Sequence, residues 1–351
     1  MMDKARRYIE LILSETPREI RLMEVCGTHT VSISRMGIRP LLLPKIRLIS
    51  GPGCPVCVTA EEDIDKAFQL IDKGATLLTF GDMMRVPSGG ETLYHRKSRG
   101  ADVRVVYSPI DAVRFAKLNP QKLCVFLGVG FETTAPTVAG AMELAFKDKL
   151  KNFFVLSLMK TMPIPLRFIS SHPDLRVDGF ILPGHVSTII GRKAYEFIAE
   201  EFSIPAVISG FEPQDILVNL RELVRLVSSK EARIVNGYRR AVRENGNEDA
   251  RALLYKYFEP ADAIWRGIGL LEGSGLKIRD EFAFMDAEIQ FELQRRKIKQ
   301  VKGCKCGEVI LGAKVPTDCP FFGKSCTPLT PLGPCMISSE GTCAAYYKYG
   351  S

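Results

Sequence analysis

The 351-residue sequence lacks the features that would place a protein in a membrane or on a nucleic acid. No apolar run approaches the roughly 18 residues that a membrane-spanning helix needs. The net charge is +8, but the basic residues are scattered and no aromatic-basic face accompanies them. Apolar residues make up 46% of the chain and charged residues 25%, as in a globular protein with a packed core. We therefore expect a cytoplasmic protein that binds neither membranes nor nucleic acids.

The common nucleotide-binding signatures are also missing. The loop 128–134 (Gly-Val-Gly-Phe-Glu-Thr-Thr) follows an apolar run and precedes a helical pattern, a placement that suits anion binding. It has neither the Gly-Lys-Ser/Thr of a P-loop nor the third glycine of a dinucleotide fingerprint. Glu132 in this loop is a candidate proton carrier, or a residue that orients a metal ligand, and a helix cap is an equally good interpretation.

Cysteine, in contrast, is abundant and unevenly distributed. In a cytoplasmic chain this abundance favours metal binding or redox chemistry over structural disulfides. Cys124 lies within an apolar run and is interpreted as a small buried hydrophobic residue. The other nine form an early group and a tail group: Cys26, Cys54 and Cys57, then Cys304, Cys306, Cys319, Cys326, Cys335 and Cys343.

Short β-rich apolar runs alternate with helical patterns, which is typical of parallel α/β units. After a first helix at 4–13, we expect strands at 21–25, 46–50, 76–80, 103–107, 123–127, 153–158, 179–182, 206–209 and 233–235. We expect helices at 60–73, 111–117, 136–146, 191–200 and 215–227. Several of the strands run into polar, glycine-rich phrases, and ligands of open α/β sheets bind beyond such strand ends.

This order predicts an α/β fold with two parallel-sheet domains that face a central cleft. We place the first domain at 1–120, with the early cysteine loops, and the second at 121–230. From about residue 235 the pattern changes to helices rich in Arg and Glu. Residues 231–351 are therefore expected to form a helical region that ends in the cysteine-rich tail, where bound metal would replace a missing apolar core.

Cys54 and Cys57 form a C-x-x-C pair just before a predicted helix. The positive end of a helix dipole stabilises a thiolate, which favours thiol–disulfide exchange. The acidic residues 61–63 in the first helical turn oppose this effect. Half of a zinc site is the alternative interpretation.

Two of the four histidines lie in glycine-containing phrases at predicted strand ends. Cys26 and His29, in Cys-Gly-Thr-His-Thr, can act as nucleophile and base, or can bind a transition metal. His185, in Pro-Gly-His-Val-Ser, can be a base or a ligand. A structural turn at Cys26 and a loop-bonding role for His185 are the alternatives.

The six tail cysteines are separated by one, twelve, six, eight and seven residues. Structural zinc sites usually contain paired C-x-x-C knuckles, which this tail lacks. Scattered single cysteines suit an iron–sulfur cluster, and we rank that cofactor above zinc. A cluster with four cysteine ligands leaves two thiols, which can form a redox pair beside it.

Five phrases, in this order, resemble the HypD family of hydrogenase maturation factors: Cys-Gly-Thr-His-Thr at 26–30, Gly-Pro-Gly-Cys-Pro-Val-Cys at 51–57, Gly-Phe-Glu-Thr-Thr at 130–134, Pro-Gly-His-Val-Ser at 183–187, and Gly-Pro-Cys-Met-Ile-Ser-Ser-Glu-Gly-Thr-Cys at 333–343. The resemblance covers nearly the whole chain. It implies a scaffold on which the Fe(CN)2CO unit of [NiFe]-hydrogenase is assembled. The implied partners are HypC and HypE, and HypE delivers cyanide that HypF derives from carbamoyl phosphate. The family is also associated with ATP hydrolysis, and nucleotide binding here stays open.

The resemblance also implies roles for single residues. Cys26 would share the iron with a cysteine of HypC, with His29 beside it. Cys54 and Cys57 would be a dithiol–disulfide pair that provides electrons for cyanide transfer. The tail would hold a [4Fe-4S] cluster similar to that of ferredoxin:thioredoxin reductases. We assign its ligands as Cys319, Cys326, Cys335 and Cys343, which leaves Cys304 and Cys306 spare.

Two other functions fit some of these residues. An iron–sulfur thiol–disulfide reductase acting on a protein would use Cys54 and Cys57 but not Cys26. A zinc-stabilised interaction module would have no redox role.

Overall fold

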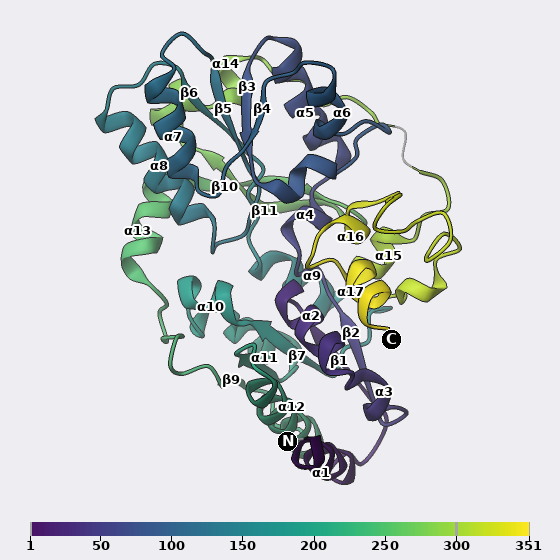
Figure 1. The fold of residues 1–351 in the computed structure, drawn as a ribbon. Helices are drawn as coiled ribbons and strands as arrows, with labels where there is room; N and C mark the ends of the chain where they lie inside the picture. The colour runs from purple at the N-terminus through teal and green to yellow at the C-terminus, as the bar shows by residue number, and fades with distance from the viewer. Residues whose placement is uncertain (1, 299–300, 351) are drawn as a thin grey trace.

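The computed structural model describes residues 2–298 and 301–350 (Figure 1). Two parallel sheets form its centre. The larger sheet contains, in spatial order, β2 (Ile46–Ser50), β1 (Ile20–Glu24), β7 (Gly179–Pro183), β8 (Ala206–Ser209) and β9 (Ile234–Asn236). The smaller sheet contains β4 (Val103–Val105), β3 (Thr76–Thr79), β5 (Cys124–Gly128) and β6 (Phe153–Ser157). An antiparallel hairpin of β10 (Phe258–Trp265) and β11 (Gly269–Ile278) lies between the two sheets in Figure 1.

Apolar sequence accounts for these strands. Every residue of β3, β5 and β7 is buried, as expected for parallel strands that are covered on both faces. In the larger sheet Leu22 pairs with Leu48 on one side and Gly179 on the other. Cys124 is buried in the core beside β3, which agrees with its interpretation as a small hydrophobic residue.

Helices cover both sheets. They include α2 (Gly27–Met36), α4 (Pro55–Val58), α5 (Glu61–Asp72), α8 (Ala135–Lys147) and α10 (Gly184–Ile190). The remaining α-helices before the tail are α1 (Met2–Ser14), α3 (Arg39–Leu42), α6 (Leu93–Ser98), α7 (Pro109–Leu118), α9 (Pro163–Ser171), α11 (Glu196–Phe202), α12 (Pro213–Ser229), α13 (Glu248–Tyr257) and α14 (Ala287–Gln290). The tail adds α15 (Cys306–Ile310), α16 (Pro334–Ile337) and α17 (Thr342–Tyr349), and there are 3₁₀ turns η1 (Gly81–Arg85), η2 (Lys193–Tyr195), η3 (Asp280–Met285) and η4 (Pro316–Asp318). Among the described residues we find no helix with the length and apolar character needed to span a bilayer.

The predicted parallel α/β class is confirmed, and all nine predicted strands are present within a few residues of their predicted ends. The boundary predicted near residue 120 does not separate the two sheets. β3 and β4 precede that point and β5 and β6 follow it, yet all four belong to one sheet. After β2 the chain leaves the larger sheet, and it returns only at β7. Such an excursion depends on long crossovers, which a local pattern does not reveal.

The prediction of a helical region after residue 230 is wrong for residues 258–278. These residues form the β10–β11 hairpin, in which Glu259 lies opposite Lys277 and forms a 2.8 Å ion pair with it. The charged residues that suggested helices here include this cross-strand pair, which stabilises a hairpin instead.

Candidate functional site

The two early cysteine phrases meet where β1 and β2 end. Because these strands are parallel neighbours, the loops that follow them lie side by side. The N–H of Gly27 donates to the carbonyl of Gly53 at 3.1 Å. A β-carbon at Gly53 would overlap the backbone of Cys26, so only glycine allows the loops to approach this closely.

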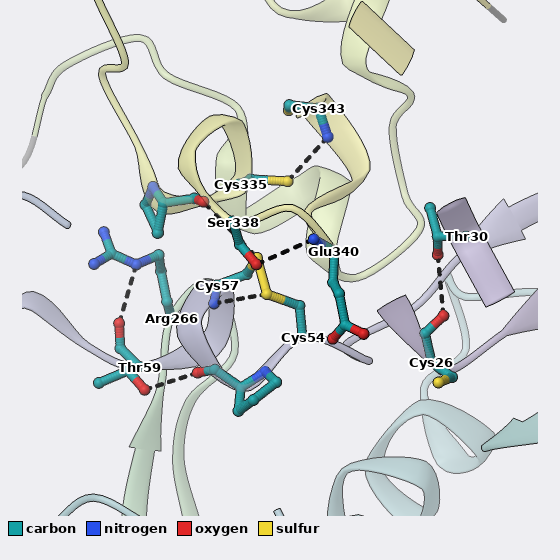
Figure 2. Close-up of a disulfide and its surroundings, with 12 residues drawn as sticks. Cys26, Thr30, Cys54, Cys57, Thr59, Arg266, Cys335, Ser338, Glu340 and Cys343 are labelled. Atoms are coloured by element: carbon teal, nitrogen blue, oxygen red, sulfur yellow. Dashed lines mark hydrogen bonds between the residues drawn. A yellow bond between two sulfur atoms is a disulfide. The ribbon is translucent and has the colours of Figure 1, made fainter. Parts of the chain in front are cut away.

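Cys54 and Cys57 are joined as a disulfide (Figure 2). Cys54 is the N-cap residue of α4, and the N–H of Cys57 donates to its Sγ at 3.1 Å. Both residues are buried. The Sγ of Cys57 lies 3.9 Å from the carbonyl oxygen of Pro334, so the tail packs directly against the pair.

Cys26 is buried at the N-cap position of α2. Burial, together with the charge of Glu340, raises the pKa of its thiol to about 11. Glu340 comes from the tail, and its Oε1 accepts a 2.6 Å hydrogen bond from the Thr28 hydroxyl. Figure 2 shows its carboxylate on the side of the disulfide that faces Cys26. Glu340 lines one small pocket with Cys54, Cys57 and Cys335.

All six tail cysteines line a second small pocket. The N–H of Cys343 donates to Cys335 Sγ at 3.2 Å, and the N–H of Leu332 donates to Cys326 Sγ at 3.4 Å. Cys304 and Cys306 therefore line the same pocket as the four residues assigned as ligands.

The donor chemistry of this pocket fits an iron–sulfur cluster. Within residues 2–298 and 301–350, no group of three or more His, Cys, Asp or Glu side chains is placed to bind a single metal ion. Thiolates that bind different irons of a cluster lie farther apart than the ligands of one ion, so this finding does not conflict with a cluster. The pocket is lined by six cysteine sulfurs and by no histidine or carboxylate. Soft sulfur ligands of this kind bind iron–sulfur clusters.

The two candidate histidines contact the same phenylalanine rather than the disulfide. The ring of Phe211 lies 4.7 Å from that of His29 and 4.0 Å from that of His185, between centroids. His29 is buried within α2, its Nε2 is 3.0 Å from the carbonyl oxygen of Gly210, and burial lowers its pKa to about 4. Its Nδ1 finds no partner among the described residues. His29 is thus a neutral imidazole with a free nitrogen.

His185 lies in the first turn of α10 and not in a loop, and burial of part of its ring lowers its pKa. The phrases Cys26-Gly-Thr-His-Thr and Pro-Gly-His-Val-Ser, predicted only to lie at strand ends, are thus the starts of helices. Both helices begin at the glycine of the phrase, and neither has a hydrogen bond from an N-cap side chain. The usual sequence signal of a helix start is therefore missing.

Glu132 is buried away from the disulfide pocket. Its Oε1 accepts a 2.8 Å hydrogen bond from the N–H of Met162, and its Oε2 has no partner in the described residues. Burial raises the pKa of this carboxyl to about 7. Because α8 is capped at Thr134, Glu132 is not a helix cap, and it can exchange a proton near neutral pH.

Two residues of this region were missed. Glu340 lies within the quoted tail phrase, but its place beside Cys26 depends on a contact across 312 positions. Phe211 follows Gly210 at the end of β8, so it carries the same strand-end signal as the chosen loops. That signal could have singled it out.

Comparison with known proteins supports one family. The sequence profile named HypD, described as "Hydrogenase formation hypA family", matches residues 3–350. The hydrogenase maturation factor HypD of Rhodobacter capsulatus is 42% identical over 356 aligned residues, which cover 100% of this chain and 94% of that protein. HypD of Azotobacter vinelandii is 45% identical, covering 99% and 94% of the two chains, and HypD of Cupriavidus necator is 45% identical, covering 93% and 89%. The chain therefore belongs to the HypD family of hydrogenase maturation factors.

Proposed function

We propose that this chain, together with HypC and HypE, is the scaffold on which the Fe(CN)2CO unit of [NiFe]-hydrogenase is assembled. One observation carries the proposal: a buried thiol at Cys26, a disulfide at Cys54–Cys57 and a cysteine-lined pocket in the tail converge from distant parts of the chain. We expect this chemistry in the cytoplasm, where thiols are kept reduced.

Cys26 is the proposed protein ligand of the iron that is being assembled. A soft thiolate suits Fe(II) that carries cyanide and CO. Burial favours the protonated thiol, so iron must displace the proton, and a HypC cysteine would complete a two-sulfur platform. The free nitrogen of His29 makes it a candidate second group near the iron.

Cys54 and Cys57 are the proposed electron donors for cyanide transfer. Release of cyanide from a thiocyanate on HypE breaks the S–C bond and consumes two electrons, which leaves a thiolate and a cyanide ion. The reduced pair provides both electrons and closes to the disulfide that is present in this structure. One of its two protons goes to the released thiolate and the other to a base or to solvent. Glu132 and His185 are the candidate proton carriers, and because neither lines the disulfide pocket, a proton would reach them through solvent.

Cys319, Cys326, Cys335 and Cys343 are the proposed ligands of a [4Fe-4S] cluster, which when bound supplies electrons one at a time. Cys335 lines both the tail pocket and the disulfide pocket, so this residue would hold the cluster beside the pair that it reduces. Metal analysis of anaerobically purified protein should give about four iron atoms per chain. Stoichiometric zinc would refute this part.

Infrared spectroscopy of the complex with HypC tests the scaffold. The wild-type complex should show CN and CO stretching bands, and Cys26→Ala should abolish them. Cys124→Ala, in the core beside β3, is the matched control and should retain them. Bands that persist in Cys26→Ala would instead favour a thiol–disulfide reductase that does not need Cys26.

A further inference from the structure

A cavity of about 410 Å³ lies apart from every cysteine of this chain. It is lined by the end of β6 and the residues after it, the hairpin β10–β11, the start of α14, and residues of α5. Its charged lining includes Asp63, Lys66, Lys160, Asp286, Glu288 and Arg295. Its size is within the range of small-molecule sites in proteins.

Lys160 is the unusual member of this lining. It is 2% exposed, although lysine is almost never fully buried unless it is paired. Across residues 2–298 and 301–350, its ammonium forms no ion pair and no hydrogen bond. Its one aromatic contact is with the ring of Trp265, at 5.8 Å. Burial lowers its pKa to about 8, against an opposing effect of the Asp63 carboxylate, so at neutral pH most of the molecules carry the charge without a direct partner.

The other cations around the cavity already have partners. Lys66 pairs with Glu288 at 2.6 Å, and Arg295 pairs with Asp63 at 2.7 Å. Lys277 pairs with Glu259 at the surface. Lys160 is thus the cation of the described lining that is left for a ligand.

We propose that this cavity binds a small molecule with one anionic group, a carboxylate or a phosphate, whose oxygens pair with the Lys160 ammonium. The acidic side chains of the lining disfavour ligands with several negative charges. The proposal does not depend on the iron chemistry proposed above.

Lys160 is connected through its backbone to the segment that contains Glu132. The N–H of Lys160 donates to the carbonyl of Gly130 at 3.0 Å, and two residues later Met162 donates to Glu132. Trp265, whose ring faces the ammonium, stacks on Phe131 with centroids 5.9 Å apart.

Lys160→Met tests the site, with Lys277→Met as the matched control. Lys277 also lines the cavity, but its side chain is 48% exposed and is already paired. Binding of inorganic phosphate and of acetate to the full-length protein is measured by calorimetry and by thermal shift, with chloride at equal ionic strength as the reference. At least one probe should bind wild type and Lys277→Met alike, and Lys160→Met should weaken it by about tenfold or more.

Without ligand, Lys160→Met should unfold at a higher temperature than wild type, because it removes a buried unpaired charge. Binding of neither probe to wild type, or equal binding to Lys160→Met, would overturn the proposal. A lower unfolding temperature of ligand-free Lys160→Met would show that the lysine is structural, and would also overturn it.

Discussion

The hydroxyl of Thr28 donates a 2.6 Å hydrogen bond to Oε1 of Glu340, which joins the first turn of α2 to the cysteine-rich tail. A β-carbon at Gly27 would collide with Glu340, so this glycine makes room for the contact. The contact places a negative charge close to the Cys26 thiol. The tail thus influences the thiol chemistry of the early cysteine motif.

Glu340→Gln should make Cys26 more reactive. The neutral amide can still accept from Thr28, but it no longer opposes ionisation of the thiol, so the pKa of Cys26 falls below about 11. We expect alkylation of Cys26 by iodoacetamide to accelerate by up to about tenfold at a fixed, mildly alkaline pH. Peptide mass spectrometry measures the rate, and the disulfide protects Cys54 and Cys57.

Glu308→Gln is the control for this experiment. Glu308 is a tail carboxylate that pairs with Lys305 at 3.0 Å and is not among the charges that act on Cys26. Its removal should leave the alkylation rate unchanged. Equal acceleration in both variants would mean that Glu340 has no specific influence.

Gly53→Ala should destabilise the protein by about 2 kcal/mol or more. The new methyl group would overlap backbone atoms of Cys26, which cannot rotate away as a side chain can. Urea unfolding measures the free energy. Gly140→Ala in α8 is the control, because its β-carbon would meet only Leu253, at 3.8 Å. That variant should be unchanged or more stable by up to about 1 kcal/mol, and equal effects in both would contradict the close approach of the loops.

Glu132→Gln should change how stability depends on pH. The folded-state pKa of Glu132 is raised to about 7 from an ordinary 4.5, so the folded protein holds a proton that the unfolded chain releases. Wild-type stability therefore falls as pH rises through this interval, and this loss is complete above it. Glutamine removes the loss, so the variant should gain stability over wild type at about pH 8 relative to about pH 5.

Glu143→Gln should change the stability of the folded protein in the opposite direction. Hydrogen bonds from Lys147 and Lys256 lower the pKa of Glu143 to about 2, so its ionised form contributes stability above about pH 4.5. This variant should therefore lose stability at neutral pH. Chemical unfolding at about pH 5 and pH 8 compares the variants: Glu143→Gln should be less stable than wild type at both values, whereas the difference for Glu132→Gln should change between them. A flat response of Glu132→Gln would argue against a buried, proton-holding carboxyl.

Phe211→Leu should raise the pKa of His185 toward its ordinary value of 6.5, because loss of the stacked ring admits water. NMR titration of the imidazole protons can follow this in a chain with four histidines. Phe202→Leu, which removes an aromatic contact with Phe197 instead, should leave His185 unchanged. An unshifted His185 in Phe211→Leu would mean that Phe211 does not control its environment.

Local sequence was sufficient for much of the fold. β2 and β8 begin and end at the predicted residues, because a short apolar run between turn residues has few alternatives to a buried strand. α2 was not predicted, because its first turn contains a glycine, two threonines and a histidine, which resemble a loop. Its packing against α17 of the tail stabilises it.

The cysteine phrases, their order and the all-sulfur character of the tail could be read from the chain, because they depend only on residue identity and spacing. Tertiary structure decided which of these groups meet. β1 lies between β2 and β7, and β2 is not followed in its sheet by β3, because the crossovers carry the chain from one sheet to the other and back. Glu340 reached Cys26, and Cys304 and Cys306 reached the other tail cysteines, through contacts between distant segments. Burial then raised the pKa values of Cys26 and Glu132 and lowered that of His29, since desolvation depends on the packing around a group and not on its sequence neighbours.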